Sequence, residues 1–315
     1  MFKAFYDPSR MWFIHNDLVN SGLIKEVNPE KIRKTACFYS EKINVYIDLS
    51  DGRADAFNYP EYTDRIEWVV NDSRGKKFLF FKNWYSPTLC VNMEKVANSN
   101  NGKIIPFYYW ADWSHFKSYI WPNRSNLYKQ NKETIKKFEV GGCFKPVIRK
   151  TPGPYKNNPE MSWAGCKWFN LEQNVDTSVW LEHDERVKRH DILTRSNFSY
   201  QHMQNVKFKD YHQASMGWKA VIDVPGIANV THRMFEHGWN GQCIILTKSD
   251  VDFPISWKSY YPEVDFSQNN WQEDVQKIIS EYNVWGDKIK YYLENYCNSS
   301  TITKYFIEKI QENIN

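Results

Sequence analysis

The expected fold rests on one stretch, residues 219–254, which reads KAVIDVPGIANVTHRMFEHGWNGQCIILTKSDVDFP. Two apolar runs in it, Ala220–Ile222 and Cys243–Leu246, have the length and composition of buried parallel strands. Between them, Thr231 can cap a helix, and Gly241 can close it. Strand, loop, helix and strand in this order predict a βαβ unit, which places the start of the helix at the carboxyl edge of the sheet.

The predicted helix carries side chains that suit an anionic ligand. Its first free backbone N–H groups and its dipole favour an anion such as a diphosphate. Arg233 in the first turn adds a positive charge and a forked donor for phosphate oxygens. Glu236 lies three residues further on, on the same helix face, where its carboxylate could accept hydrogen bonds from sugar hydroxyls. The alternative is that Arg233 and Glu236 simply pair with each other on an exposed helix.

The wider pattern is Pro-Gly, then Thr-x-Arg-x-x-Glu, then Gly-x-Cys-Ile-Ile-Leu, then Asp and Phe-Pro. It resembles the donor-binding segment of exostosin-like glycosyltransferases, in which two Rossmann-like halves face each other across a cleft. The resemblance implies that Arg233 contacts the nucleotide diphosphate and that Glu236 holds the ribose. It extends upstream to Phe208–Tyr211 and departs from the family at Gln242, which separates the glycine from the cysteine. The membrane-anchored, lumenal architecture of the family is also missing from this sequence.

The fold that follows is α/β, with two Rossmann-like domains facing across a cleft (the GT-B type). We expect an acceptor-binding domain over residues 1–140 and a nucleotide-sugar donor-binding domain over 141–300, with the boundary at Gly141-Gly142. A last helix, 301–315, can return to the first domain. Other expected strands are Ile43–Leu49, Ile66–Val70, Phe78–Phe81, Ile104–Trp110, Phe144–Ile148 and His190–Leu193, and other expected helices are 11–23, 125–138 and 271–292.

Composition narrows the class of ligand. The chain has 315 residues and a formal net charge of +4, with 25% charged residues. This fits a small anionic ligand and lacks the concentrated basic patches of a nucleic-acid binder. Aromatic residues make up 17% of the chain and could stack on sugar rings, although packing in cores is their commoner use.

Cysteine spacing and hydropathy bear on the compartment. The six cysteines are scattered without a Cys-x-x-Cys pair, which indicates neither a zinc site nor a disulfide framework. The sequence shows no apolar signal core and no membrane span. We expect a cytoplasmic protein, in the host cytoplasm if it is viral, since the composition looks like that of transferases of large algal DNA viruses or AT-rich bacteria.

Several further residues are expected to bind the donor or to act as the catalytic base. The base should come from a strand end in the first domain, where Asp48, Asp51, Asp112 and His115 lie; we rank Asp51 ahead of Asp112. Asp51 could equally be a turn residue, and Asp112 a helix cap. On the donor side, basic or loop residues near expected strand ends complete the set: Gly226, Thr231, His232, Arg149, Lys150 and Arg195.

These observations predict a glycosyltransferase that moves a sugar from a nucleotide sugar to a glycan hydroxyl. We expect a UDP-sugar donor, with UDP-xylose as one option, an inverting displacement with an Asp base, and no metal or other cofactor. The first alternative is a metal-dependent transferase of GT-A type that uses Asp250 and Asp252, because hard cations prefer carboxylate oxygens. The second is a carbohydrate-binding protein without catalysis. The sequence contains no Gly-x-Ser-x-Gly, P-loop or Gly-x-Gly-x-x-Gly motif.

Overall fold

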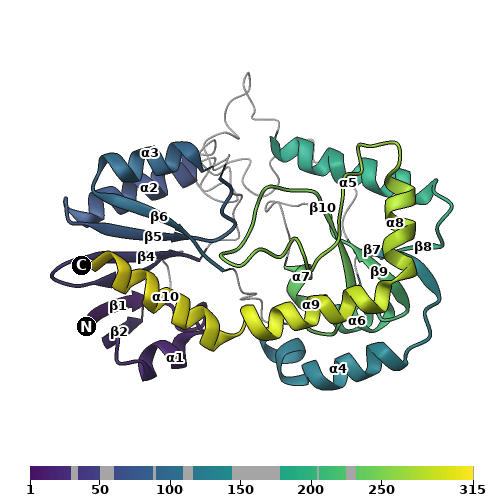
Figure 1. Ribbon diagram of the computed structural model, residues 1–315, viewed down its shortest axis with the longest axis horizontal. Coiled ribbons are helices and arrows are strands. Elements are labelled where there is room, and N and C mark those ends of the chain that lie inside the picture. The colour runs from purple at the N-terminus through teal and green to yellow at the C-terminus, as the bar shows by residue number, and fades with distance from the viewer. Residues whose placement is uncertain are drawn as a thin grey trace.

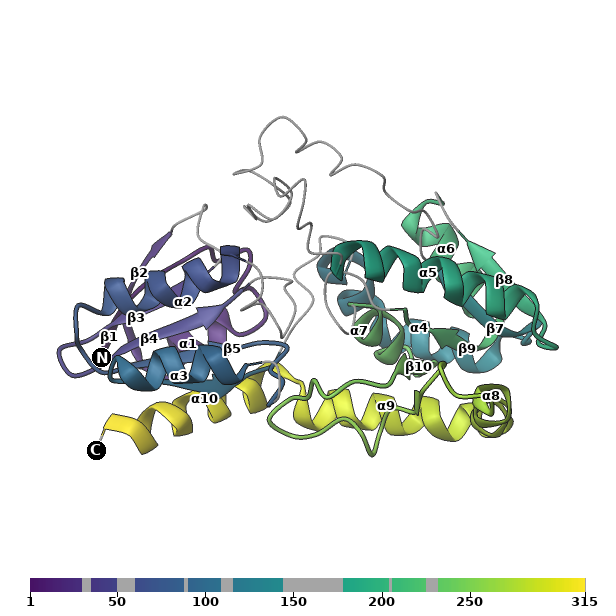
Figure 2. The same cartoon turned by 90° about the horizontal axis from the view of Figure 1, so that it is seen from above.

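The computed structural model describes residues 1–29, 35–49, 60–87, 90–108, 116–143, 178–203, 206–224 and 232–314, with the backbone alone for 60–65 and 178–185. These residues form two lobes, each a β-sheet with helices on both faces (Figure 1, Figure 2). The α/β class expected from the sequence is confirmed. None of the described helices has the combination of length and apolar character that crossing a membrane requires.

The first sheet is mixed. Its order is β2-β1-β3-β4-β5-β6, and among these strands only β3 runs against its neighbours. The strand bounds are β1 Phe2–Tyr6, β2 Ile24–Pro29, β3 Thr35–Tyr39, β4 Asn44–Asp48, β5 Phe78–Lys82 and β6 Gly102–Pro106. Because β4, β5 and β6 are parallel, their carboxyl ends meet at one edge of the sheet.

Alternating side chains of β5 pack against different helices. Phe78 and Phe80 pack with the core under α2 (Pro60–Ser73) and α3 (Val91–Ser99). Leu79 and Phe81 belong to the core under α1 (His15–Asn20) and α10 (Ser299–Ile314). Successive strand residues point to opposite faces, so a strand that is apolar throughout must be covered on both sides.

The second sheet is parallel, in the order β11-β10-β9-β7-β8. Its strands are β7 Phe138–Cys143, β8 Tyr200–Met203, β9 Trp218–Ile222, β10 Cys243–Thr247 and β11 Glu263–Val264. From β7 the chain goes to β8 on one side and then to β9, β10 and β11 on the other. The order therefore reverses between β7 and β9, and in open α/β sheets ligands bind at the carboxyl ends of the strands at such a switch point.

Helices cover both faces of the second sheet. The helix α5 (Ser178–Thr194) and α8 (Trp271–Ser280) pack on one face, where Leu193 and Val275 meet Ala220 and Ile222. The other face carries a π-helical turn, Phe116–Ile120, followed by four helices: α4 (Trp121–Glu133), α6 (Phe208–Ser215), α7 (Arg233–Gly238) and α9 (Tyr282–Tyr296).

The predicted βαβ unit is confirmed in its elements, since β9 and β10 are parallel and α7 lies between them in sequence. Two other predicted strands are wrong. Ile66–Val70 lies in α2, and His190–Leu193 lies in α5. Ile66 and Val69 are both buried at a spacing of three residues, as on the inner face of a helix. A short apolar run does not distinguish a buried strand from a buried helix turn by its own pattern.

The elements around the expected domain boundary are also defined. Gly141 and Gly142 lie inside β7, which pairs with both β8 and β9, so the second sheet begins before the glycine pair. The expected strand Phe144–Ile148 lies outside the described residues. The expected helix 271–292 is two helices, α8 and α9, which separate at Glu281.

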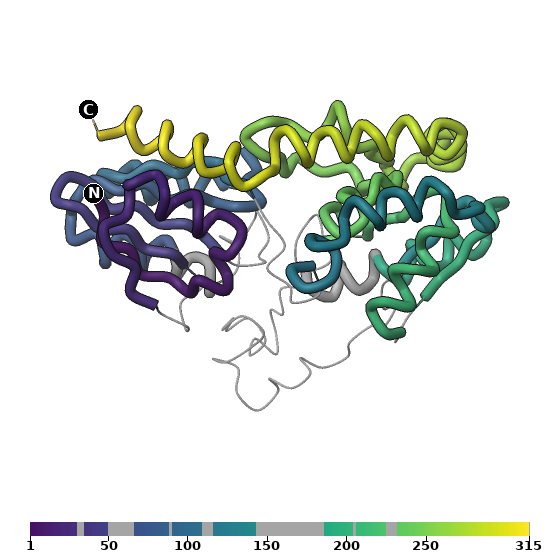
Figure 3. Tube along the Cα trace, turned by 90° about the horizontal axis from the view of Figure 1, so that it is seen from below, coloured from purple at the N-terminus to yellow at the C-terminus, as the bar shows by residue number. Residues whose placement is uncertain are grey.

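Aromatic contacts and the C-terminal helices join the lobes. Phe253, after β10, contacts Trp84 and Tyr108 of the first lobe, with ring centroids 5.7 and 5.8 Å apart, and Phe235 of α7 at 6.0 Å. The helix α9 runs along the second lobe and α10 along the first (Figure 3). Phe306 of α10 packs on Phe81 at 4.7 Å, so the end of the chain is part of the core of the first lobe.

Candidate active site

A group of charged residues gathers where β9 ends and α7 begins. Asp223 directly follows β9 and is 2% exposed. Its backbone N–H donates to the carbonyl of Ile245 (2.9 Å), which continues the pairing with β10. Arg233, the first residue of α7, places its guanidinium 3.5 Å from the Asp223 carboxylate. The pair therefore lies at the carboxyl edge of the second sheet, beside the switch point between β7 and β9.

Glu236 lies one turn further into α7 and is 3% exposed. Burial raises the pKa of its carboxyl to about 7; Arg233 works in the opposite direction, and Asp223 adds to the rise. His232 lies 3.7 Å from the Glu236 carboxylate, and burial together with Arg233 and Arg186 lowers the pKa of its imidazole. The imidazole is neutral near pH 7, so among the described residues of this group Arg233 and Arg186 carry the positive charge.

Buried hydrogen bonds join α7 to α6 and to Gln242, which follows α7 in the chain. Tyr211 of α6 hydrogen-bonds to Nε2 of His237 at 2.5 Å, and Nδ1 of His237 lies 2.7 Å from Oε1 of Gln242. The Gln242 amide donates to the carbonyl of Ser215 (2.7 Å), which leaves Oε1 as the acceptor. His237 therefore carries its proton on Nδ1, and the Tyr211 hydroxyl donates to Nε2. Gln242, the residue that departs from the exostosin-like pattern, ties the turn after α7 to α6.

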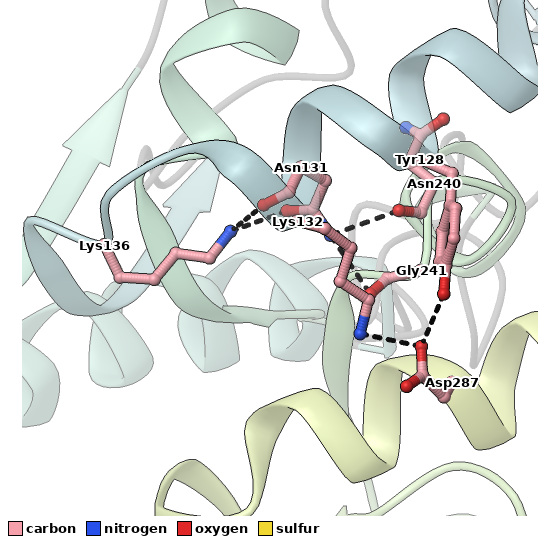
Figure 4. A network of polar contacts seen from close by, with 7 residues as sticks. All are labelled: Tyr128, Asn131, Lys132, Lys136, Asn240, Gly241 and Asp287. Carbon is pink, nitrogen blue, oxygen red and sulfur yellow. Dashed lines mark hydrogen bonds and ion pairs between the residues drawn. The ribbon is translucent and has the colours of Figure 1, made fainter.

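The turn that follows α7 is enclosed by two other helices (Figure 4). Asn131 of α4 donates to the carbonyls of Asn240 and Gly241, at 3.1 Å each. Gly241 has φ +67°, and a Cβ placed there would lie 2.6 Å from the ring of Tyr128. On the other side, a Cβ on Gly286 of α9 would lie 2.1 Å from the Gly241 carbonyl oxygen. Only glycine fits at this crossing, which fixes the end of α7.

The structure brings together three of the residues predicted for the donor, Arg233, Glu236 and His232, and adds Asp223 and Arg186. Asp223 could have been found from the sequence, because it follows the predicted strand Ala220–Ile222 directly. Arg186 could not, because α5 was not predicted.

Arg195 is not part of this group. It is exposed and follows α5, in the connection that leads into the amino end of β8. Since β8 is parallel to β7 and β9, Arg195 lies at the amino edge of the sheet, opposite to the carboxyl edge where Arg233 begins α7. The expected position of Arg195 depended on a strand at His190–Leu193, where the chain is helical. Six predicted site residues and His115 lie outside the described residues: Asp51, Asp112, Arg149, Lys150, Gly226 and Thr231.

At the matching edge of the first sheet, Asp48 ends β4 and Lys82 ends β5. Both side chains are 0% exposed, and the ammonium lies 2.7 Å from the carboxylate. Lys82 also donates to the carbonyl of Asn83 at 2.9 Å. A carboxylate enclosed in this way cannot reach the hydroxyl of an incoming sugar. Asp48 therefore orders the end of β4, and the geometry does not support it as a base.

Asp250 and Asp252 make contacts between the lobes. Asp250 accepts a short hydrogen bond from the hydroxyl of Ser86. Asp252 accepts from the backbone of Phe253 (2.8 Å) and Trp257 (3.1 Å), while its own N–H donates to the Tyr85 carbonyl (3.1 Å). Within the described ranges, no group of three or more His, Cys, Asp and Glu side chains could hold a metal ion.

No protein-family model and no curated protein matches the chain. Among solved structures, it is similar to the crystal structure of MurG from Acinetobacter baumannii, with 9% sequence identity and a TM-score of 0.33 over 95% of this chain and 88% of that one. A likeness of this degree carries no conclusion about function, which must come from the residues of the site.

Proposed function

We propose that this protein is a glycosyltransferase of the two-domain GT-B type, with a nucleotide-sugar donor bound at α7 and a glycan acceptor presented by the first lobe. The observation that carries the proposal is the grouping of Arg233, Glu236 and Asp223 at the carboxyl edge of a parallel sheet, next to its switch point. This is where open α/β sheets bind ligands. The helix α7 also lies on the side of the second lobe that faces the first lobe (Figure 2).

Each charged residue has a role in this proposal. Negative charge builds on the diphosphate as the sugar departs, and fixed positive charge at that point lowers the barrier. Arg233 supplies it through its guanidinium, and Arg186 adds to the positive field. Asp223 orients the guanidinium of Arg233 from behind. Glu236 accepts hydrogen bonds from the ribose hydroxyls, with an ionised carboxylate.

The chemistry that we propose is a direct displacement. A base in the first lobe removes the proton of the acceptor hydroxyl while the oxygen attacks the anomeric carbon and the nucleotide diphosphate leaves from the opposite face. This inverts the anomeric centre and needs no metal. Asp51 and Asp112 are the proposed bases, and UDP is the proposed nucleotide. A metal-dependent site on Asp250 and Asp252 is less well supported, because both carboxylates accept hydrogen bonds from protein groups.

The donor proposal is tested by calorimetric titration of the protein with UDP, GDP and CMP. We expect UDP to bind, and Arg233→Ala to weaken UDP binding by roughly tenfold to a hundredfold, since hydrogen bonds to charged groups contribute roughly 1.5–3 kcal/mol. Arg195→Ala is the matched control, because it removes an exposed arginine at the opposite edge of the same sheet and should leave the affinity unchanged.

Two results would count against the proposal. If none of the three nucleotides binds the intact chain, the donor site is wrong. If Arg195→Ala weakens binding as much as Arg233→Ala, the effect is one of overall charge and not of position at α7.

A further inference from the structure

The second lobe has a cavity at the amino edge of its sheet, opposite to the edge where α7 begins. It has a volume of about 760 Å³ and lies between the end of α4, the end of α6 and the first residues of β7. Gln130, Gln213 and Phe138 are among its lining residues. This is the size of a site for a small molecule, typically some 300–1,000 Å³. Because α7 begins at the carboxyl edge, this cavity is separate from the proposed donor site.

Hydrogen bonds join the end of α4, the residues after α6 and the start of β7, which surround the cavity. Lys136 donates from its ammonium to the carbonyl and the side-chain oxygen of Asn131 in α4, at 2.9 and 2.7 Å, and to the carbonyl of Met216 after α6, at 2.7 Å (Figure 4 shows the Asn131 contacts). The backbone N–H groups of Lys137 and Phe138 both donate to the Gly217 carbonyl, at 2.7 and 3.1 Å. The two helix ends therefore hold a fixed spacing, and the cavity is formed before any ligand arrives.

Three glutamines are among the residues that line this cavity, one each from α4, β8 and α6. Gln201 of β8 accepts a hydrogen bond from the indole of buried Trp218 at 2.6 Å, which occupies its side-chain oxygen, while its amino group is a donor by its chemistry. Gln130 and Gln213 are exposed and carry both a donor and an acceptor. Such groups pair with hydroxyls, which also donate and accept.

The remaining lining favours an uncharged ligand with an apolar face. Glu133 and Lys137 contribute one charge of each sign to the lining, and the nearby ammonium of Lys136 already donates to three protein oxygens, so the lining residues carry no net charge. Phe138 and Ile135 are apolar residues of the lining, and Ile135 is 81% exposed. A sugar ring carries hydroxyl groups at its edge, which could pair with the glutamines, and C–H groups on its faces, which could contact the apolar residues.

We infer that this cavity is a binding site for a neutral oligosaccharide, on the outer side of the second lobe and independent of the donor site. It would retain a distant part of a glycan chain, or a separate glycan, without taking part in the transfer step. The inference stands on the lining residues and does not require the proposed transferase activity.

The test is saturation-transfer NMR and calorimetric titration of the full chain with maltotriose, cellotriose, xylotriose and chitotriose. We expect at least one of them to bind, and the double variant Gln130→Ala/Gln213→Ala to weaken that binding at least tenfold. Both glutamines are exposed, so the variant should fold as the parent does, which circular dichroism checks. The matched control is Gln276→Ala, which removes an exposed glutamine on α8, and it should bind like the parent.

The outcomes separate this site from the proposed donor site. We expect Arg233→Ala to leave oligosaccharide binding unchanged and the double glutamine variant to leave UDP binding unchanged. The inference is overturned if no oligosaccharide binds, if the double variant binds as tightly as the parent, or if UDP displaces the bound oligosaccharide.

Discussion

Glu236, one of the residues of the proposed donor site, is buried in the folded protein. Its carboxyl is enclosed in α7, and burial raises its pKa to about 7 although Arg233 is close. A carboxylate that is costly to ionise in the free protein gains most from a ligand that donates hydrogen bonds to it. The buried position is therefore compatible with a role toward ribose hydroxyls.

The raised pKa of Glu236 makes a prediction about stability. Between pH 4.5, the ordinary pKa, and pH 7, the folded protein binds more protons than the unfolded chain, so the free energy of unfolding falls as pH rises. Glu236→Gln removes this titration. We expect the free energy of unfolding of the variant, relative to the parent, to increase by up to about 3 kcal/mol between pH 4.5 and pH 8.

Urea denaturation of both proteins over this pH range measures the difference. The comparison at pH 4.5 serves as the internal reference, because the Glu236 carboxyl is then protonated in the folded parent. A difference between variant and parent that stays constant from pH 4.5 to pH 8 would show that the carboxyl ionises as it does in water.

At the scale of the element, α7 depends on its surroundings. It spans six residues, Arg233–Gly238, and a helix of this length is not stable alone. Asn131 holds the turn that follows it, and Gly286 of α9 touches that turn closely. The positions of Arg233 and Glu236 thus depend on helices that lie far away in sequence.

The close approach of Gly286 to the Gly241 carbonyl predicts that alanine at position 286 destabilises the protein, which is opposite to the usual effect of such a change in a helix. Replacing a glycine inside a helix by alanine ordinarily stabilises it, by about 0.5–1 kcal/mol. We expect Gly286→Ala instead to destabilise the protein by about 1–3 kcal/mol, because the added Cβ overlaps the Gly241 carbonyl. Thermal and chemical denaturation measure the change. Val284→Ala, at a half-exposed position of the same helix, is the control and should change stability by less than about 0.5 kcal/mol. A more stable Gly286→Ala variant would disprove the close crossing.

At the scale of the whole molecule, Phe253 connects the lobes. Its side chain is 4% exposed and packs against Trp84, Tyr108 and Phe235. Since Phe235 belongs to α7, the helix that carries the proposed donor residues contacts the first lobe through the ring of Phe253. The relative position of the lobes and the position of α7 are therefore linked.

We expect Phe253→Ala to lower the free energy of unfolding by about 3–5 kcal/mol, as for buried phenylalanines in general. Tyr291→Ala, which truncates an aromatic ring that is 52% exposed on α9, should lower it by less than about 1 kcal/mol. Differential scanning calorimetry and urea denaturation measure both. A loss for Phe253→Ala as small as that for Tyr291→Ala would mean that the lobes are not packed together at this ring.

The parts of the fold that could be predicted are those whose signals are contiguous in sequence. β9, α7 and β10 follow one another within a single stretch, and each is delimited by residues that favour turns or helix ends, so their types and their order were predictable. The α/β class followed from them. The resemblance to exostosin-like transferases, the UDP donor and the cytoplasmic location stay predictions.

The prediction of secondary structure failed for short apolar runs in which the spacing of apolar residues was ambiguous. Ile66–Val70 and His190–Leu193 are each too short to show whether their apolar residues recur every second or every third to fourth position. In both cases the segment forms part of a helix that packs on a sheet, and this tertiary packing decided its conformation. The misplacement of Arg195 followed from the second error, and the same error hid Arg186.

The sequence by itself determined the local units: a strand, a loop, a short helix with Arg233 and Glu236, and a second strand. Only the tertiary structure decided that Glu236 is buried, that Asp48 is enclosed with Lys82 from another strand, and that glutamines from three elements line one cavity. The physical reason is that burial and charge pairing depend on contacts between residues distant along the chain. Local patterns record which face of an element is apolar, but not what that face will meet.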